Sequence, residues 1–224
     1  MSVCLYLGKK IFHDFISSLE LFLDKNSSNL SGNDYHELYF EFWNRMKKSI
    51  GSSSNFTGVS EFLIFHTLKS MLGLEYKIEP IRELAGNDKD DLIRRKFHAL
   101  SKNLIIGHEI PFWINGNGPS LTIRKGTICP DISIQYDNEL RSIIEIKLYV
   151  GSKSDIETVF NSLIKIKQAY PHLKCLLIIY VKTSDPIKNA LKEYEENYEW
   201  FSFRILQENN EKITSILNFI NPLV

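Results

Sequence analysis

Hydrophobic and polar residues alternate in two neighbouring stretches at the centre of the chain, residues 131–136 and 140–148. A period of two is typical of β-strands, because successive side chains point to opposite faces. The apolar side chains of both strands lie on the same face only if the residue numbers of directly opposite residues add up to an even number. A three-residue loop at 137–139, which pairs Tyr136 with Leu140, meets this condition. The resulting hairpin sets Asp131 opposite Glu145, with Cβ atoms roughly 5 Å apart.

Hydrophobic residues at helical spacing predict helices over much of the remaining chain. In the helix that ends near Gly73, Glu61 lies at the N-terminal end of the stripe formed by Phe65, Leu68 and Leu72. A continuous apolar strand is predicted at 174–182. Further strands are expected at about 104–113 and at 199–206, and helices at 9–24, 34–48, 59–73, 87–101, 154–171, 185–198 and 211–220.

The order of these elements predicts an α/β protein with a mixed central sheet covered by helices. The first helices form an N-terminal helical layer. We expect two parts, an N-terminal helical region at 1–50 and a domain at 51–224, separated by the Ser-rich break at 51–58.

The composition excludes several classes of protein but does not indicate whether the partner is a nucleic acid. The chain has 224 residues, with 27 Lys plus Arg and 27 Asp plus Glu. No apolar run reaches the roughly 20 residues that span a bilayer, so we expect an intracellular, cytoplasmic protein with no membrane partner. Its three cysteines, Cys4, Cys129 and Cys175, offer neither a disulfide framework nor a CxxC metal site. HExxH and GxSxG motifs are absent from the sequence, which disfavours protease and esterase functions.

Two carboxylates held as close as Asp131 and Glu145 repel each other unless a cation lies between them. A hard divalent cation, which prefers oxygen ligands, would neutralise this repulsion. Mg²⁺ prefers one or two carboxylates together with water and phosphate oxygens. The carbonyl of Ile146 adds a third oxygen. Lys147, next on the same face, is placed to orient or activate a water molecule and to offset phosphate charge. A bulge near Pro130 would change this register.

Pro130-Asp131, a gap of 13 residues and then Glu145-Ile146-Lys147 on consecutive strands resemble the PD-(D/E)XK nuclease superfamily, which has the restriction-endonuclease-like fold. The core of that family runs helix, three strands, helix, strand, and the resemblance covers about residues 58–182. It implies that Asp131, Glu145 and Lys147 are catalytic. It also implies a metal site made by Glu61, Asp131, Glu145 and Ile146.

The resemblance further implies Mg²⁺ as cofactor, with Mn²⁺ as a substitute, and nucleic acid as partner. A glutamine on the helix after the motif occurs in some relatives, and Gln168 matches that position although the spacing to Tyr170 departs from the QxxxY pattern. Basic side chains give further candidate phosphate contacts. The full set of candidate nucleic-acid-binding residues is Gln168, Arg94, Arg95, Lys96 and Lys165.

These observations favour a metal-dependent nuclease, and among nucleases a DNA endonuclease. The alternatives are a non-cleaving nucleic-acid-binding or assembly module with the same fold, and a structural domain whose hairpin mimics the motif. The segment 158–184 contains lysines and no acidic residue, so a homodimer would cluster these lysines for a phosphate backbone. Divergence of the three motif side chains, or a salt bridge that fills the metal position, would contradict an enzyme.

Overall fold

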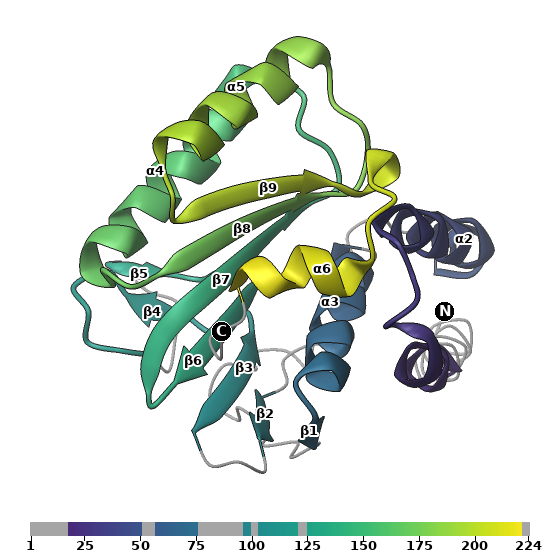
Figure 1. Ribbon diagram of the computed structural model, residues 1–224, viewed down its shortest axis with the longest axis horizontal. Coiled ribbons are helices and arrows are strands. Elements are labelled where there is room, and N and C mark those ends of the chain that lie inside the picture. Colours follow the sequence, from purple (N-terminus) through teal and green to yellow (C-terminus); the bar gives the residue numbers. More distant parts are fainter. Residues whose placement is uncertain (1–17, 51–56, 76–95, 100–102, 121–124, 221–224) are drawn as a thin grey trace.

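The computed structural model describes residues 18–50, 57–75, 96–99, 103–120 and 125–220. In this part of the chain a seven-stranded mixed sheet, with the order β1-β2-β3-β6-β7-β8-β9, lies between two groups of helices (Figure 1). The predicted α/β class and the mixed sheet are therefore confirmed.

The helices follow the periodic segments closely. After a first helix at 18–26 they are α2 (Gly32–Ile50), α3 (Thr57–Met71), α4 (Lys153–Ala169), α5 (Asp185–Asn197) and α6 (Ile213–Leu217), and α6 continues into a 3₁₀ turn at Asn218–Ile220. The strands are β1 (Leu74–Glu75), β2 (Lys96–Ala99), β3 (Leu104–His108), β4 (Phe112–Trp113), β5 (Thr127–Ile128), β6 (Ile132–Tyr136), β7 (Glu139–Lys147), β8 (Lys174–Ile179) and β9 (Phe201–Ile205).

The direction of the strands changes in the middle of the sheet. Strand β6 pairs antiparallel with both β3 and β7, whereas β7, β8 and β9 run parallel. Each parallel step needs a crossover, and α4 and α5 supply the two. Helix α4 starts with a capping box in which Ser152 and Asp155 exchange hydrogen bonds, so its first turn is fixed close after the end of β7.

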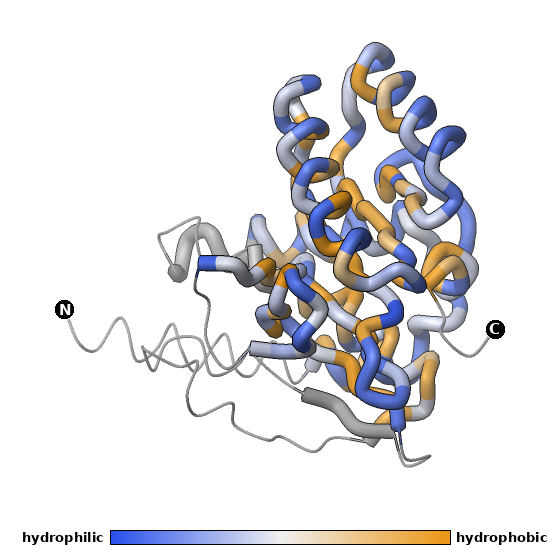
Figure 2. Tube along the Cα trace, turned by 90° about the vertical axis from the view of Figure 1, so that its left-hand side faces the viewer, coloured by the Kyte–Doolittle hydropathy of each residue, from blue (hydrophilic) through white to orange (hydrophobic). Residues whose placement is uncertain are grey.

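Two hydrophobic cores cover the two faces of the sheet. Helices α2, α3 and α6 pack on the face that carries Ile132, Ile134, Ile144 and Ile146, and α4 and α5 pack on the other face (Figure 1). The central strands are hydrophobic in Figure 2 because both of their faces are packed. The polar row of β6 is buried as well, since Ser133 and Gln135 are 0% and 4% exposed.

The hairpin between β6 and β7 corrects the predicted loop. Asp137 and Asn138 alone form the turn, with φ of 51° and 64°, and Tyr136 pairs with Glu139 rather than with Leu140. Positive φ at both positions is typical of the two-residue turn whose twist matches that of the strands. The predicted loop length was therefore wrong by one residue.

A β-bulge close to the turn restores the predicted register for the rest of the hairpin. Gln135 pairs with Leu140 and Ile134 with Ser142, so Arg141 is the extra residue on β7. Beyond the bulge Ile132 pairs with Ile144, which is the register that the sequence predicted for the motif. The bulge lies away from Pro130, the position at which the sequence suggested a bulge.

The predicted helix at 87–101 is wrong where the structure describes it. Lys96–Ala99 is strand β2, which pairs antiparallel with β3 and places Phe97 opposite Ile106. Strand β3 supplies hydrogen-bond partners for the backbone of β2, and such tertiary pairing overrides the helix propensity of the segment. Arg94 and Arg95 lie outside the described residues. The strand predicted at 104–113 also divides, into β3 and the short β4 of a separate two-stranded sheet.

In the part of the chain that the structure describes, no helix is both long and apolar enough to cross a membrane.

The hairpin turn gives a stability prediction. Asn138→Val should lower the free energy of unfolding by about 1–2 kcal/mol, because a β-branched residue is strained at positive φ. Asn138→Gly should preserve or raise stability, since glycine adopts this conformation without strain. Urea denaturation of both variants measures the difference. Equal stability of the two variants would contradict a positive φ at position 138.

Candidate active site

The end of the β6–β7 hairpin brings the three motif side chains together. Asp131 immediately precedes β6, and Glu145 and Lys147 lie at the end of β7. Lys147 Nζ lies 3.4 Å from Glu145 Oε2 and 3.8 Å from Asp131 Oδ2. The side chains of Asp131 and Glu145 are 19% and 16% exposed, and that of Lys147 is 36% exposed. The predicted catalytic residues therefore converge at a partly buried place that solvent reaches.

Asp131 is held by the backbone of both neighbouring strands. Its Oδ2 accepts a hydrogen bond of 2.6 Å from the Ile146 N–H, and its carbonyl accepts one of 3.0 Å from the N–H of Glu109. These bonds fix the carboxylate beside β7 without help from any flexible side chain.

Pro130 explains why the Ile146 carbonyl is available to a ligand. Continued past Ile132 and Ile144, the β6–β7 pairing would set Ile146 opposite Pro130. Proline has no backbone N–H, so β6 offers no donor to the Ile146 carbonyl. The Ile146 N–H is taken by Asp131, on the same side of the strand. A carbonyl oxygen thus lies next to the two carboxylates.

The two carboxylates are held in an unfavourable electrostatic environment. Burial raises the pKa of Asp131 to about 6, a rise that Lys147 opposes and the charge of Glu61 increases. Burial and then the charge of Asp131 raise the pKa of Glu145 to about 7.

Lys147 is the cation that balances part of this charge. Its pKa is raised in spite of burial, because the Asp131 and Glu145 carboxylates stabilise the ammonium. One ammonium balances only one of the two carboxylates. Its contacts of 3.4 and 3.8 Å are also longer than the 2.7–2.9 Å of a tight charge-assisted hydrogen bond. A bridging contact is nevertheless present, and it is the interaction with which a metal ion must compete.

The oxygen donors of this site fit a hard divalent cation. Asp131, Glu145 and the Ile146 carbonyl supply carboxylate and carbonyl oxygens, the ligands that Mg²⁺ and Mn²⁺ prefer. A divalent cation would also relieve the repulsion that raises the pKa of both carboxylates. Within the described residues no group of three or more His, Cys, Asp or Glu side chains is placed to hold a metal ion. The described site therefore depends on two carboxylates and backbone oxygen.

Glu61, the fourth predicted ligand, is bonded to a histidine. Its Oε2 lies 2.5 Å from Nε2 of His108, which ends β3. The Glu61 side chain is 13% exposed and that of His108 is 1% exposed. Glu61 is near enough for its charge to raise the pKa of Asp131 and of Glu145. It therefore lies close to the carboxylate pair, while its own carboxylate is committed to His108.

His108 is the site neighbour that the sequence analysis missed. It pairs with Ile132, the residue after Asp131, and packs against Phe65 of α3 with ring centroids 6.0 Å apart. Its Nδ1 is buried and has no hydrogen-bond partner among the described residues. The signal was available in the sequence, because His108 interrupts an otherwise apolar strand at the row that faces the Glu61 helix.

The predicted nucleic-acid-binding residues do not join this cluster. Lys165 and Gln168 are exposed near the C-terminal end of α4. That end lies about 20 Å along the helix from Ser152, at 1.5 Å per residue. Lys96 belongs to β2, at the opposite side of the sheet from β8. Contacts of these residues with a nucleic acid stay predictions.

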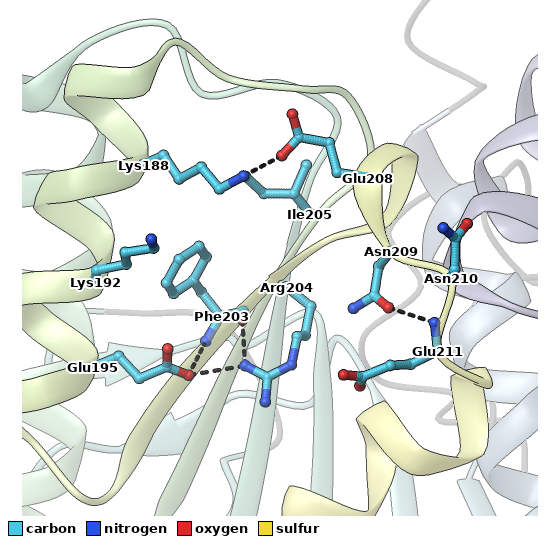
Figure 3. Close-up of a pocket in the computed structure, with 10 residues that line it drawn as sticks. All are labelled: Lys188, Lys192, Glu195, Phe203, Arg204, Ile205, Glu208, Asn209, Asn210 and Glu211. Carbon is cyan, nitrogen blue, oxygen red and sulfur yellow. Dashed lines mark hydrogen bonds and ion pairs between the residues drawn. The ribbon is translucent and has the colours of Figure 1, made fainter.

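An open groove of about 580 Å³ lies at the other edge of the sheet, beside β9 and α5 (Figure 3). Lys188 pairs with Glu208 at 2.5 Å, and Arg204 pairs with Glu195 at 2.8 Å. Arg204 and Glu195 also bond the carbonyl and N–H of Phe203, at 2.6 and 3.4 Å. Side chains thus cover the backbone N–H and carbonyl of Phe203 in the middle of this edge strand, which disfavours pairing with another strand there. No predicted site residue lines the groove.

Comparison of the chain with protein-family models, with curated proteins and with solved structures finds no match.

The raised pKa of the carboxylates predicts how stability depends on pH. Between about pH 4 and 7 the folded state binds more protons at Asp131 and Glu145 than the unfolded state does, so their contribution to stability falls as pH rises. Glu145→Gln should therefore be more stable than the native protein at about pH 8, by about 1–3 kcal/mol. The difference should shrink towards about pH 5.

Thermal unfolding across this pH range measures the effect. Glu139→Gln is the matched control, because Glu139 lies on the same strand with a 62% exposed side chain. A Glu145→Gln variant that is less stable than the native protein at every pH would contradict the repulsion.

Proposed function

We propose that this chain is a Mg²⁺-dependent nuclease that hydrolyses phosphodiester bonds, and specifically a DNA endonuclease. The succession of α3, β3, β6, β7, α4 and β8 supports a restriction-endonuclease-like arrangement, because it follows the helix, three strands, helix, strand order of that core. Strands β1, β2, β4, β5 and β9, helices α5 and α6, and the helices before α3 are additions to it.

The observation that carries this proposal is the convergence of Asp131, Glu145 and Lys147 at the end of two paired strands. One carboxylate directly precedes β6 and the other lies on β7, and both of these strands are packed on both faces of the sheet. An ordinary surface pair of Glu and Lys would have neither the second carboxylate nor the burial that raises the pKa of both acids.

Each residue has a separate part in the proposed reaction. Asp131, Glu145 and the Ile146 carbonyl hold the cation, and Mn²⁺ is expected to replace Mg²⁺ because it accepts the same oxygen donors. The bound cation would polarise a phosphate oxygen and acidify a water molecule. Glu61 adds negative charge beside the pair.

Lys147 acts as a positive charge in this proposal. Because its pKa is raised, the side chain stays an ammonium at neutral pH and cannot take up a further proton. An ammonium at this position offsets the charge of the phosphate and donates hydrogen bonds to an attacking water molecule or a phosphate oxygen.

The partner in this proposal is DNA, and its backbone needs a basic surface. Two lysines of 158–184 already have partners within the chain. Lys182 pairs with Glu208 at 3.1 Å, and Lys167 donates to the carbonyls of Pro171 and Leu173. The homodimer that would cluster these lysines stays a prediction, which sedimentation with and without DNA tests.

The proposal predicts metal-dependent cleavage of plasmid or single-stranded DNA. Lys147→Ala and Asp131→Asn should each lower the rate by at least about 100-fold, because each removes charge that acts on the transition state. Chelation of divalent cations should abolish cleavage in the native protein. Lys192→Ala is the control, since Lys192 is an exposed lysine on α5, outside the site.

Circular dichroism must show that the variants fold. If the native protein cleaves no DNA in Mg²⁺ or Mn²⁺, the proposed nuclease function is wrong. Salt-sensitive DNA binding without cleavage would then support the non-cleaving nucleic-acid-binding module. Absence of binding would leave only a structural domain.

A further inference from the structure

Tyr149 is an exposed aromatic residue next to the proposed active site. Its side chain follows Lys147 by two residues, and Tyr149 is 58% exposed, one of four large hydrophobic residues that are exposed in the described part of the chain. Two residues of extended chain span at most about 7 Å. The Cα atom of Tyr149 therefore lies within about 7 Å of the Cα atom of Lys147.

The chain crosses the end of the sheet at Tyr149. Leu148 packs against the core that contains α3, and its carbonyl accepts a hydrogen bond of 2.9 Å from the Val181 N–H. Val150 is 2% exposed and belongs to the other core, with α4. Both neighbours are thus anchored on opposite faces of the sheet, and Tyr149 between them stays exposed, two residues after Lys147.

Gly151 holds the Tyr149 ring in place. A Cβ atom at Gly151 would lie 2.8 Å from Cε1 of the ring, so the ring packs directly on the glycine backbone. That backbone is itself fixed, because the N–H groups of Gly151 and Ser152 both donate to Asp155 Oδ2, at 3.1 and 2.9 Å. The capping box of α4 therefore supports an exposed ring in a defined position.

We propose that Tyr149 stacks on an unpaired nucleobase beside the phosphate that the active site attacks. The inference rests on the proposed nuclease function and adds the substrate class, single-stranded or locally unpaired DNA. In a duplex, neighbouring bases cover both faces of each base, so an aromatic ring gains a base to stack on only where pairing is broken. Stacking on an aromatic ring tolerates any base and suits a platform with no hydrogen-bonding pocket.

Steady-state cleavage of a fluorescent single strand of about 20 nucleotides, and of its duplex, tests the stacking. Tyr149→Ala should raise KM for the single strand about 5- to 100-fold, the range found when a base-stacking aromatic is removed, and leave kcat within about 3-fold. Tyr149→Phe should keep the native KM, because it retains the ring. Tyr149→Leu should resemble Tyr149→Ala, because it is apolar without a ring.

Substrates with one abasic position provide the second half of the test. For the native protein, an abasic position next to the cleaved phosphate should raise KM by the same factor as Tyr149→Ala. For Tyr149→Ala the same abasic substrate should cause no further rise, because the two changes remove one interaction. Phe22→Ala, at another exposed aromatic residue, on the helix at 18–26, is the matched control.

The outcomes separate this inference from the proposed function. Native cleavage with equal KM for the native protein and Tyr149→Ala would overturn the stacking and leave the nuclease intact. Independent effects of Tyr149→Ala and the abasic position would also overturn it. Absence of cleavage by the native protein would overturn the nuclease and this inference together.

Discussion

The antiparallel pairing of β6 with β7 forces Asp131 and Glu145 to lie side by side at the end of the sheet. The Asp131 carboxylate is bonded to the Ile146 backbone, and the backbone of Glu145 is fixed in β7, which pairs with β6 and with β8. Burial raises the pKa of both acids, the charge of Glu61 adds to the rise at Asp131, and the charge of Asp131 adds to the rise at Glu145. A protein gains no stability from this arrangement, and the repulsion is the reason to expect that the site binds a cation.

The rest of the fold withstands this repulsion. Both faces of β6, β7 and β8 are packed against helices, so a slip of one residue in register would move every side chain of a strand to the wrong core. The helix α3 delivers Glu61 to the same end of the sheet, and β3 delivers His108 to meet it. Helix α4 fixes the chain immediately after Lys147 through its capping box. Helices α3 and α4 and strands β3, β6 and β7 thus meet near one site.

The sequence could predict the parts of this site that follow from the alternation of side chains between the two faces of a strand and from helical spacing. Alternation along the hairpin sufficed to place Asp131 beside Glu145, although the loop was one residue too long, because the bulge at Arg141 compensates for the shorter turn. A bulge leaves no period of its own in the sequence. The strand β2 was missed because pairing with β3 decides its conformation, and His108 because its partner lies 47 residues away.

Calorimetric titration of the native protein with Mg²⁺ or Mn²⁺, in buffers of different ionisation enthalpy, tests the central claim most directly. A cation gripped by Asp131 and Glu145 should bind at one site and release protons near about pH 6.5, because both acids must ionise to hold it. Glu145→Gln should abolish that binding. If the native protein takes up no divalent cation, or releases no protons as it does so, the ammonium of Lys147 alone balances the carboxylates and the account is wrong.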